Sequence, residues 1–101
     1  MATRKSRAGF VYIAESVRPD GSVKLYVGMT GRPIHERVAE HIREVETQNR
    51  RTWCGRGRSF RLLGWRATED RFRLEREIKR KSAEQKKKLA LEWTLERANK
   101  H

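Results

Sequence analysis

Two short runs rich in β-branched and aromatic residues, joined by a turn sequence, most constrain how this chain can fold. The first run, residues 10–14, reads FVYIA, and the second, residues 23–27, reads VKLYV with alternating polar and apolar positions. Such runs are typical of β-strands. Residues 19–22 (PDGS) favour a turn between them, because proline presets its own φ and glycine accepts a positive φ. The pattern predicts an antiparallel hairpin.

An amphipathic helix is predicted after the hairpin. Residues 28–32 are expected to form a short loop, and Pro33 suits the first turn of a helix that fades in the polar stretch 47–52. Apolar residues recur through this segment at helical spacing and form one stripe. The stripe consists of Ile34, Val38, Ile42 and Val45.

Capping residues set the expected limits of two further helices. Thr68 is the expected N-cap of a helix that runs to about Lys81, with acidic residues in its first turn. Ser82 and Gln85 have the spacing of a capping box, which predicts a last helix over residues 83–98.

Together these elements predict a small fold of the α/β (α+β) class. Residues 60–65 (FRLLGW) read as a third strand, after a glycine-rich segment at 54–58 that is expected to be irregular loop. The result is a three-stranded antiparallel sheet flanked by helices, in the order ββαβαα. A chain of 101 residues is expected to be one domain, residues 1–101, with residues 1–7 as a basic, flexible lead-in.

Charge points to a polyanionic partner. The chain has 25 Lys and Arg against 13 Asp and Glu, a net charge of +12. Such an excess favours nucleic acid first and an anionic membrane surface second. No apolar run reaches the ~20 residues of a spanning helix, and no signal peptide is evident, so we expect a cytoplasmic protein without a membrane partner.

The lone Cys54 excludes an internal disulfide and a thiolate cluster, and it is expected simply to pack beside Trp53.

Two tyrosines stand out on the hairpin. Tyr12 and Tyr26 each alternate with aliphatic neighbours, so both rings can share one sheet face if the register allows. The alternative is that they only pack the core.

Arg37 and His41 lie one helical turn apart at the margin of the apolar stripe. They could bind a phosphate or form a solvated edge. Glu75 falls on an inward-facing arc between Phe72 and Ile78, where a carboxylate needs a metal ion or an arginine partner.

Basic residues elsewhere could contact phosphates. Arg56 and Arg58 flank a glycine that lets the backbone approach a ligand, although a flexible charged loop would look the same. The lysine-rich runs 79–81 and 86–88 are most simply solvated helix faces. The histidines and the cysteine lack the spacing of a zinc motif.

Read in order, these features resemble a known family. Phe10-Val11-Tyr12 followed by Tyr26-Val27-Gly28 resembles the paired tripeptides of the GIY-YIG nucleases. Arg37 and His41 on one helix and Glu75 on a later helix match that family's order of functional residues. The resemblance covers Gly9 to about Leu89, and within the family it is to the small stand-alone members. Phe10 departs from the glycine of the family's name.

The resemblance implies a divalent-metal-dependent DNA endonuclease that hydrolyses phosphodiester bonds, one strand at a time. It implies that Glu75 holds one Mg²⁺ or Mn²⁺ ion and that Tyr12, with a lowered pKa, positions or deprotonates the attacking water. Arg37 would stabilise charge on the phosphate, while Tyr26 and His41 orient water and phosphate. Residues expected to bind nucleic acid are Arg56, Arg58, Lys79 and Arg80.

DNA, including branched or damaged DNA, is therefore the expected partner, and the chain is expected to be a monomer or weak dimer. A protein partner could supply specificity. The alternative function is a non-catalytic basic module that binds nucleic acid, RNA included, and needs neither Glu75 nor metal.

Overall fold

The computed structural model describes residues 6–99, and the first five residues of the expected lead-in lie outside the described residues. The predicted α+β fold and the order ββαβαα are confirmed. The elements are β1 (Gly9–Val17), β2 (Val23–Thr30), α1 (Ile34–Glu46), β3 (Ser59–Thr68), α2 (Arg71–Lys79) and α3 (Ala83–Ala98), and the 3₁₀ turn η1 (Cys54–Arg56) precedes β3.

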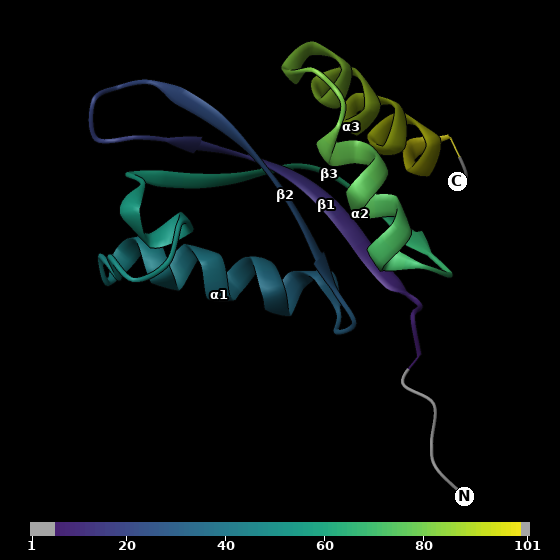
Figure 1. Ribbon diagram of the computed structural model, residues 1–101, viewed down its shortest axis with the longest axis horizontal. Helices are drawn as coiled ribbons and strands as arrows, with labels where there is room; N and C mark the ends of the chain where they lie inside the picture. Colours follow the sequence, from purple (N-terminus) through teal and green to yellow (C-terminus); the bar gives the residue numbers. More distant parts are fainter. Residues whose placement is uncertain (1–5, 100–101) are drawn as a thin grey trace, which may run out of the picture.

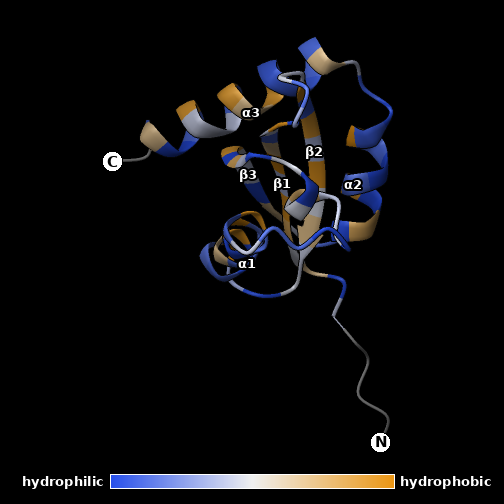
Figure 2. Ribbon diagram, turned by 90° about the vertical axis from the view of Figure 1, so that its left-hand side faces the viewer, coloured by the Kyte–Doolittle hydropathy of each residue, from blue (hydrophilic) through white to orange (hydrophobic). Residues whose placement is uncertain are grey.

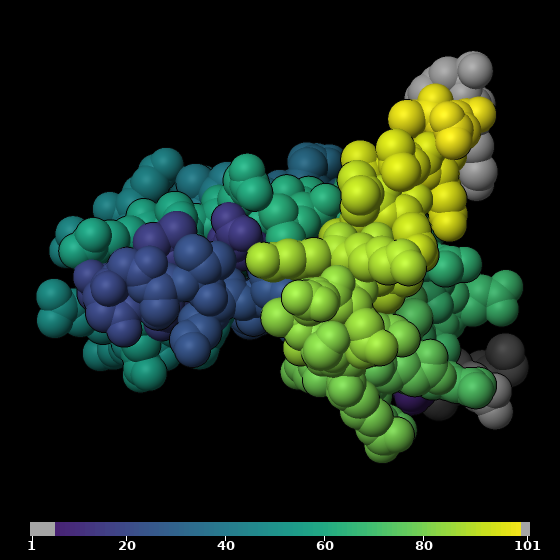
Figure 3. Space-filling view, turned by 90° about the horizontal axis from the view of Figure 1, so that it is seen from above, coloured from purple at the N-terminus to yellow at the C-terminus, as the bar shows by residue number. Residues whose placement is uncertain are grey.

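The three strands form one antiparallel sheet in the order β2-β1-β3, so β1 is central and β2 is an edge strand. Helix α1 covers one face of the sheet, and α2 and α3 cover the other (Figure 1). Figure 3 shows the hairpin at one end of the molecule and α2 and α3 toward the opposite end.

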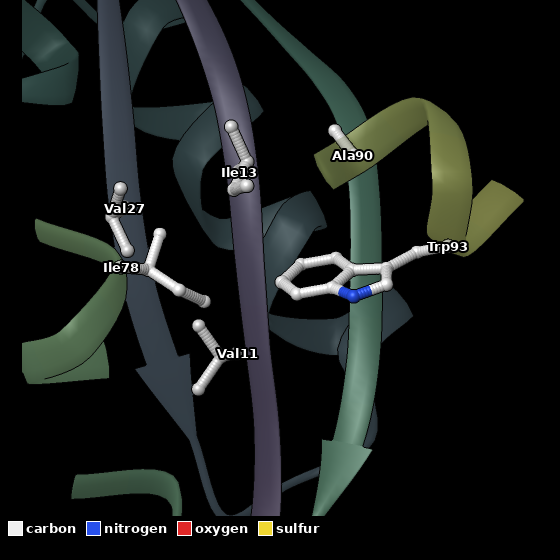
Figure 4. Packing of buried hydrophobic residues seen from close by; sticks show 6 residues of the cluster. All are labelled: Val11, Ile13, Val27, Ile78, Ala90 and Trp93. Atoms are coloured by element: carbon white, nitrogen blue, oxygen red, sulfur yellow. The ribbon is translucent and has the colours of Figure 1, made fainter. Parts of the chain in front are cut away.

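Alternation along β1 divides the core into two layers. Val11 and Ile13 point toward α2 and α3, where they pack against Ile78, Ala90 and Trp93 (Figure 4). Tyr12 and Ala14 point toward α1 and η1. The apolar residues are concentrated on the strands, and polar residues dominate the outer helical surface (Figure 2). The first layer is apolar, whereas the second contains the titratable groups described below.

Strand β2 is longer than the sequence predicts. Residues 28–30 were expected in a loop, but they continue the strand to Thr30. Gly28 lies directly opposite Tyr12 in the register. A Cβ atom at position 28 would lie 2.4 Å from Cζ and from the hydroxyl oxygen of Tyr12. Glycine is therefore needed here to leave room for a ring, and not to form a turn.

Helix α1 presents a different residue to the sheet from the one predicted. Ile42, expected in the apolar stripe, is 40% exposed, while His41 beside it is 2% exposed. Ile34, Val38 and Val45 do pack against the sheet, as predicted. The helix is rotated so that the imidazole takes a core position, because it meets a polar partner there.

The capping signals are confirmed for α3 and corrected for α2. Ser82 and Gln85 form the predicted capping box, with both reciprocal hydrogen bonds present. Thr68 belongs to β3 instead, and Asp70 is the N-cap of α2, its side chain accepting from the backbone N–H of Arg73. A capping carboxylate two residues later allows the strand to continue through Thr68.

Two smaller points concern the segments expected to be irregular. The glycine-rich segment 54–58 contains the 3₁₀ turn η1, so part of it is regular. At the start of the described residues, Arg7 forms an ion pair of 3.1 Å with Asp70.

Among residues 6–99, none of the helices has both the length and the apolarity needed to cross a bilayer.

Candidate active site

A hydrogen bond between sheet and helix lies at the centre of the candidate site. The hydroxyl of Tyr12 on β1 is 2.7 Å from Nε2 of His41 on α1. Tyr12 is 0% exposed and His41 is 2% exposed. A polar pair buried this deeply stabilises the fold only because each group satisfies the other, since an unpaired buried donor or acceptor costs about 1–3 kcal/mol. The bond therefore fixes the position of α1 on the sheet.

Aromatic rings surround this pair. Tyr26 lies diagonally across the hairpin from Tyr12 on the same face, with ring centroids 6.1 Å apart, as its sequence alternation indicated. The His41 ring is 5.3 Å from Tyr26 and 4.7 Å from Phe60 of β3. Trp53 stacks on Tyr26 at 5.3 Å and closes the cluster at the surface. Tyr26 is thus the outer tyrosine, half-buried, and Tyr12 is the inner one.

Burial dominates the electrostatics of both tyrosines. Desolvation raises the pKa of Tyr12 well above its ordinary value, and the neighbouring Tyr26 raises it further, while Arg37 opposes them. A lowered pKa was expected for Tyr12 from nearby positive charge. In the protein alone its pKa is raised instead, because the hydroxyl is fully enclosed. Burial also raises the pKa of Tyr26, but both Arg37 and the Tyr12 hydroxyl favour its ionised form.

Arg37 lies beside the cluster in a network of carboxylates. Its guanidinium is 2.7 Å from Glu40, which also binds Arg32 at 2.6 Å, and 3.9 Å from Glu44. The Arg37 side chain is 28% exposed, so one part of it faces solvent. Its charge acts on Tyr12, Tyr26 and His41 alike. Arg37 is therefore placed to attract an anion toward the outer tyrosine, Tyr26.

Nδ1 of His41 faces Glu44 on the next turn of the helix. The two atoms are 3.5 Å apart, and within the described residues Nδ1 makes no hydrogen bond. Burial lowers the pKa of His41, and Arg37 lowers it further, whereas Glu44 raises it. Burial and Arg37 thus favour the neutral imidazole, whereas the Glu44 carboxylate favours the imidazolium.

Glu75 approaches from the other side of the sheet. It lies on α2, with its side chain 18% exposed, and its carboxylate is 3.3 Å from the ammonium of Lys79. The sequence suggested a metal ion or an arginine as the partner of this carboxylate, and the structure pairs it with a lysine. The Glu75 charge contributes to raising the pKa of Tyr26, although burial is the main cause. Glu75 therefore acts on the outer tyrosine across the edge of the sheet.

A hollow of about 380 Å³ follows the edge strand β2 between these groups. Tyr26 and Trp53 line it from the α1 side, and Lys79 and Lys86 line it from the α2 and α3 side. The guanidinium of Arg18 lies 4.2 Å from the Trp53 ring centroid. The hollow thus brings two lysine side chains and the outer tyrosine to one face.

The other expected nucleic-acid contacts lie apart from this hollow. Arg56 and Arg58 line a second hollow of about 550 Å³, near the hairpin turn and the end of α1. Nε of Arg56 donates to the backbone carbonyl of Arg50 at 2.7 Å. Arg80 is the exposed C-cap of α2. The structure brings Tyr12, Tyr26, Arg37 and His41 together, with Glu75 and Lys79 at the sheet edge, and it separates Arg56 and Arg58 from them.

The T5orf172 domain family matches residues 9–97, which is most of the chain. The chain belongs to the T5orf172 domain family. This family is nuclease-associated, which indicates a nuclease-like or nucleic-acid-related function. No curated protein and no solved structure matches the chain.

This T5orf172 domain has further site residues that sequence reasoning did not single out. Glu44 follows His41 by three positions on the same helix face, which is a local signal. Cys54 and Phe60 reach the imidazole only because η1 and β3 fold back against α1. Their approach has no signal in local sequence.

Gly28→Ala tests the packing of the T5orf172 site. The added methyl would collide with Tyr12, which is fully buried and cannot move aside, so we expect destabilisation of roughly 1–3 kcal/mol and loss of the Tyr12–His41 contact. Gly31→Ala is the matched control, because its methyl would meet only the Arg71 side chain at 3.4 Å. Urea denaturation and the side-chain nitrogen resonances of His41 report the two effects. Equal stability of the two variants would contradict the packing argument.

Proposed function

We propose that this domain is a divalent-metal-dependent DNA endonuclease of the GIY-YIG type that nicks one strand at a time. The observation that carries the proposal is the buried Tyr12–His41 hydrogen bond behind the outer Tyr26, with Arg37 alongside. A domain that only needed a packed core would gain more from apolar residues at these positions. A net charge of +12 and membership of a nuclease-associated family support a nucleic-acid substrate.

The hollow along β2 is the proposed place for the cleaved strand. Lys79 and Lys86 would contact phosphate oxygens there, and Tyr26 would face the scissile phosphate. Arg56, Arg58 and Arg80 lie elsewhere on the surface, where they would hold flanking DNA through its backbone. Since phosphate contacts carry no base information, binding is expected to be largely independent of sequence.

Glu75 fits the role of a ligand for Mg²⁺ or Mn²⁺. It offers hard carboxylate oxygens, and its carboxylate pairs with the exposed and adaptable ammonium of Lys79, which lines the hollow. One carboxylate is sufficient when waters and substrate phosphates complete the shell. An ion bound there would act as a Lewis acid toward a phosphate oxygen and would lower the pKa of bound water.

The protein's own groups divide the remaining work. Tyr26, the outer hydroxyl, orients the attacking water and, when ionised, accepts a proton from it. The water oxygen bonds to phosphorus as the bond from phosphorus to the leaving oxygen breaks, and the leaving oxygen takes a proton from solvent. The inner pair holds Tyr26 in place: the Tyr12 hydroxyl favours the ionised form of Tyr26, and neutral His41 fixes Tyr12. Arg37 stabilises negative charge on the phosphate. Tyr12 is thus a positioning residue, because it is fully enclosed.

A second function is favoured by one observation. Tyr12 is buried and its pKa is raised, which would suit a purely structural tyrosine in a binding module. Such a module predicts salt-sensitive binding without turnover, and no effect of removing Glu75 or metal.

Hydroxyl deletions separate the two functions. Wild type is expected to convert supercoiled plasmid to open circles with Mg²⁺ or Mn²⁺ and not with EDTA. Tyr26→Phe is expected to reduce the nicking rate by roughly 10²–10⁴-fold, the range for a group that acts on the attacking water. Glu75→Gln is expected to reduce it comparably, with DNA affinity retained, whereas Glu77→Gln is the control from an exposed face of the same helix.

Nicking rate and affinity are measured on the same variants at one salt concentration. If Tyr26→Phe and Glu75→Gln cut at the wild-type rate, the proposed roles of both residues are wrong. If even wild type never cuts supercoiled, branched or single-stranded DNA with either metal, the binding module is the better account.

Salt dependence tests the proposed DNA path along β2. Neutralising one lysine that contacts a phosphate should reduce the slope of log K against log salt by about one. Lys79→Gln is expected to do so. Arg73→Gln is the control, since Arg73 pairs with Glu77 and does not line the hollow. Equal slopes for Lys79→Gln and wild type would place the DNA elsewhere.

A further inference from the structure

A second group of potential metal ligands lies on the far side of the imidazole from Tyr12. It consists of an imidazole nitrogen of His41, a carboxylate oxygen of Glu44 and Sγ of Cys54, all within 4.8 Å of one another. Nδ1 of His41 lies 3.5 Å from the Glu44 carboxylate. His41 and Glu44 come from adjacent turns of α1, and Cys54 begins η1, which packs against that helix. Local spacing in the sequence excluded a zinc motif, but the fold brings three potential ligands together from segments that are apart in the sequence.

An unpartnered buried nitrogen points into this group. His41 is 2% exposed, and among residues 6–99 its Nδ1 has no hydrogen-bond partner. Buried polar atoms are nearly always satisfied, so an orphan of this kind calls for a specific explanation. The Glu44 carboxylate oxygen is 3.5 Å away, which is longer than an ordinary hydrogen bond. A cation would satisfy the nitrogen lone pair and the carboxylate together.

The donor set defines the class of cation. One imidazole nitrogen, one carboxylate oxygen and one thiolate sulfur suit Zn²⁺ or Co²⁺, whereas Mg²⁺ prefers oxygen ligands alone. Metal–ligand bonds of about 2.0–2.3 Å require the three donor atoms to draw closer than they are now. The Glu44 side chain, 18% exposed, has the freedom to do this. Arg37, 3.9 Å from Glu44, competes for the same carboxylate and would have to turn toward Glu40.

We propose that His41, Glu44 and Cys54 bind one thiophilic divalent cation of the Zn²⁺ class, with a fourth position open to water. This site is separate from Glu75, which lies on α2 across the sheet. Coordination through Nδ1 leaves the proton on Nε2, which then donates to the Tyr12 oxygen at 2.7 Å. The cation would thus select one tautomer of the imidazole and lock the hydrogen bond between helix and sheet. The proposal does not depend on nuclease activity.

Cobalt titration of chelator-treated protein tests the site directly. Because the chain contains one cysteine, a sulfur-to-cobalt charge-transfer band in the near ultraviolet must come from Cys54. We expect this band to saturate at one Co²⁺ per chain, to disappear on adding Zn²⁺ and to persist in excess Mg²⁺. The nitrogen resonances of His41 should show metal on Nδ1 and a proton on Nε2 in the Zn²⁺-loaded protein.

Variants assign the ligands. Cys54→Ser is expected to abolish the band, and Glu44→Gln is expected to weaken Co²⁺ binding. Glu46→Gln is the control: it removes the same charge from an exposed position on the same helix, and it should leave Co²⁺ binding unchanged. Circular dichroism tests whether each variant folds. If Cys54→Ser fails to fold, Glu44→Gln still tests the ligand set. Absence of the band in wild type would show that Glu44 merely faces Nδ1–H and that Cys54 only packs. Equal binding by Glu44→Gln and wild type would also overturn the proposed ligand set.

Discussion

The hydrogen bond between the Tyr12 hydroxyl and the His41 imidazole determines how the two halves of the site meet. Both side chains are enclosed, so neither can exchange its partner for water. The bond sets the rotation of α1, turning Ile42 outward so that the imidazole faces the sheet. It also requires Gly28 opposite Tyr12, because any side chain there would occupy the space of the phenol. One polar contact thus accounts for a strand residue, a helix rotation and the position of Arg37.

The sheet separates two kinds of chemistry. On the α2 and α3 side, the packing of Val11 and Ile13 against Trp93 supplies an apolar core. On the α1 side, the core contains tyrosine hydroxyls, an imidazole and a thiol. The two sides meet at the open edge of β2, where Tyr26 and Lys79 line one hollow. This division explains how a chain of 101 residues can keep an apolar core while burying groups that are costly to desolvate.

Local sequence predicted what local forces determine. The hairpin, the order of elements, the capping box of α3 and the shared face of the two tyrosines all follow from alternation, turn chemistry and capping. The sequence could not predict features that depend on distant partners. Residue 28 looked like loop because the phenol that needs its space lies on another strand. The approach of Cys54 to His41 depends on the fold of η1 against α1, which no local pattern encodes.

The central claim is that Tyr12 and His41 act as one unit on the outer tyrosine. A double-mutant cycle of Tyr12→Phe and His41→Gln, measured on the nicking rate, tests it most directly. If the two residues work only through each other, the double variant should lose no more activity than the more damaging single variant, as is found for groups that act together. Losses that multiply, so that the double variant is slower by the product of the two single effects, would show that Tyr12 and His41 contribute independently and would contradict this account.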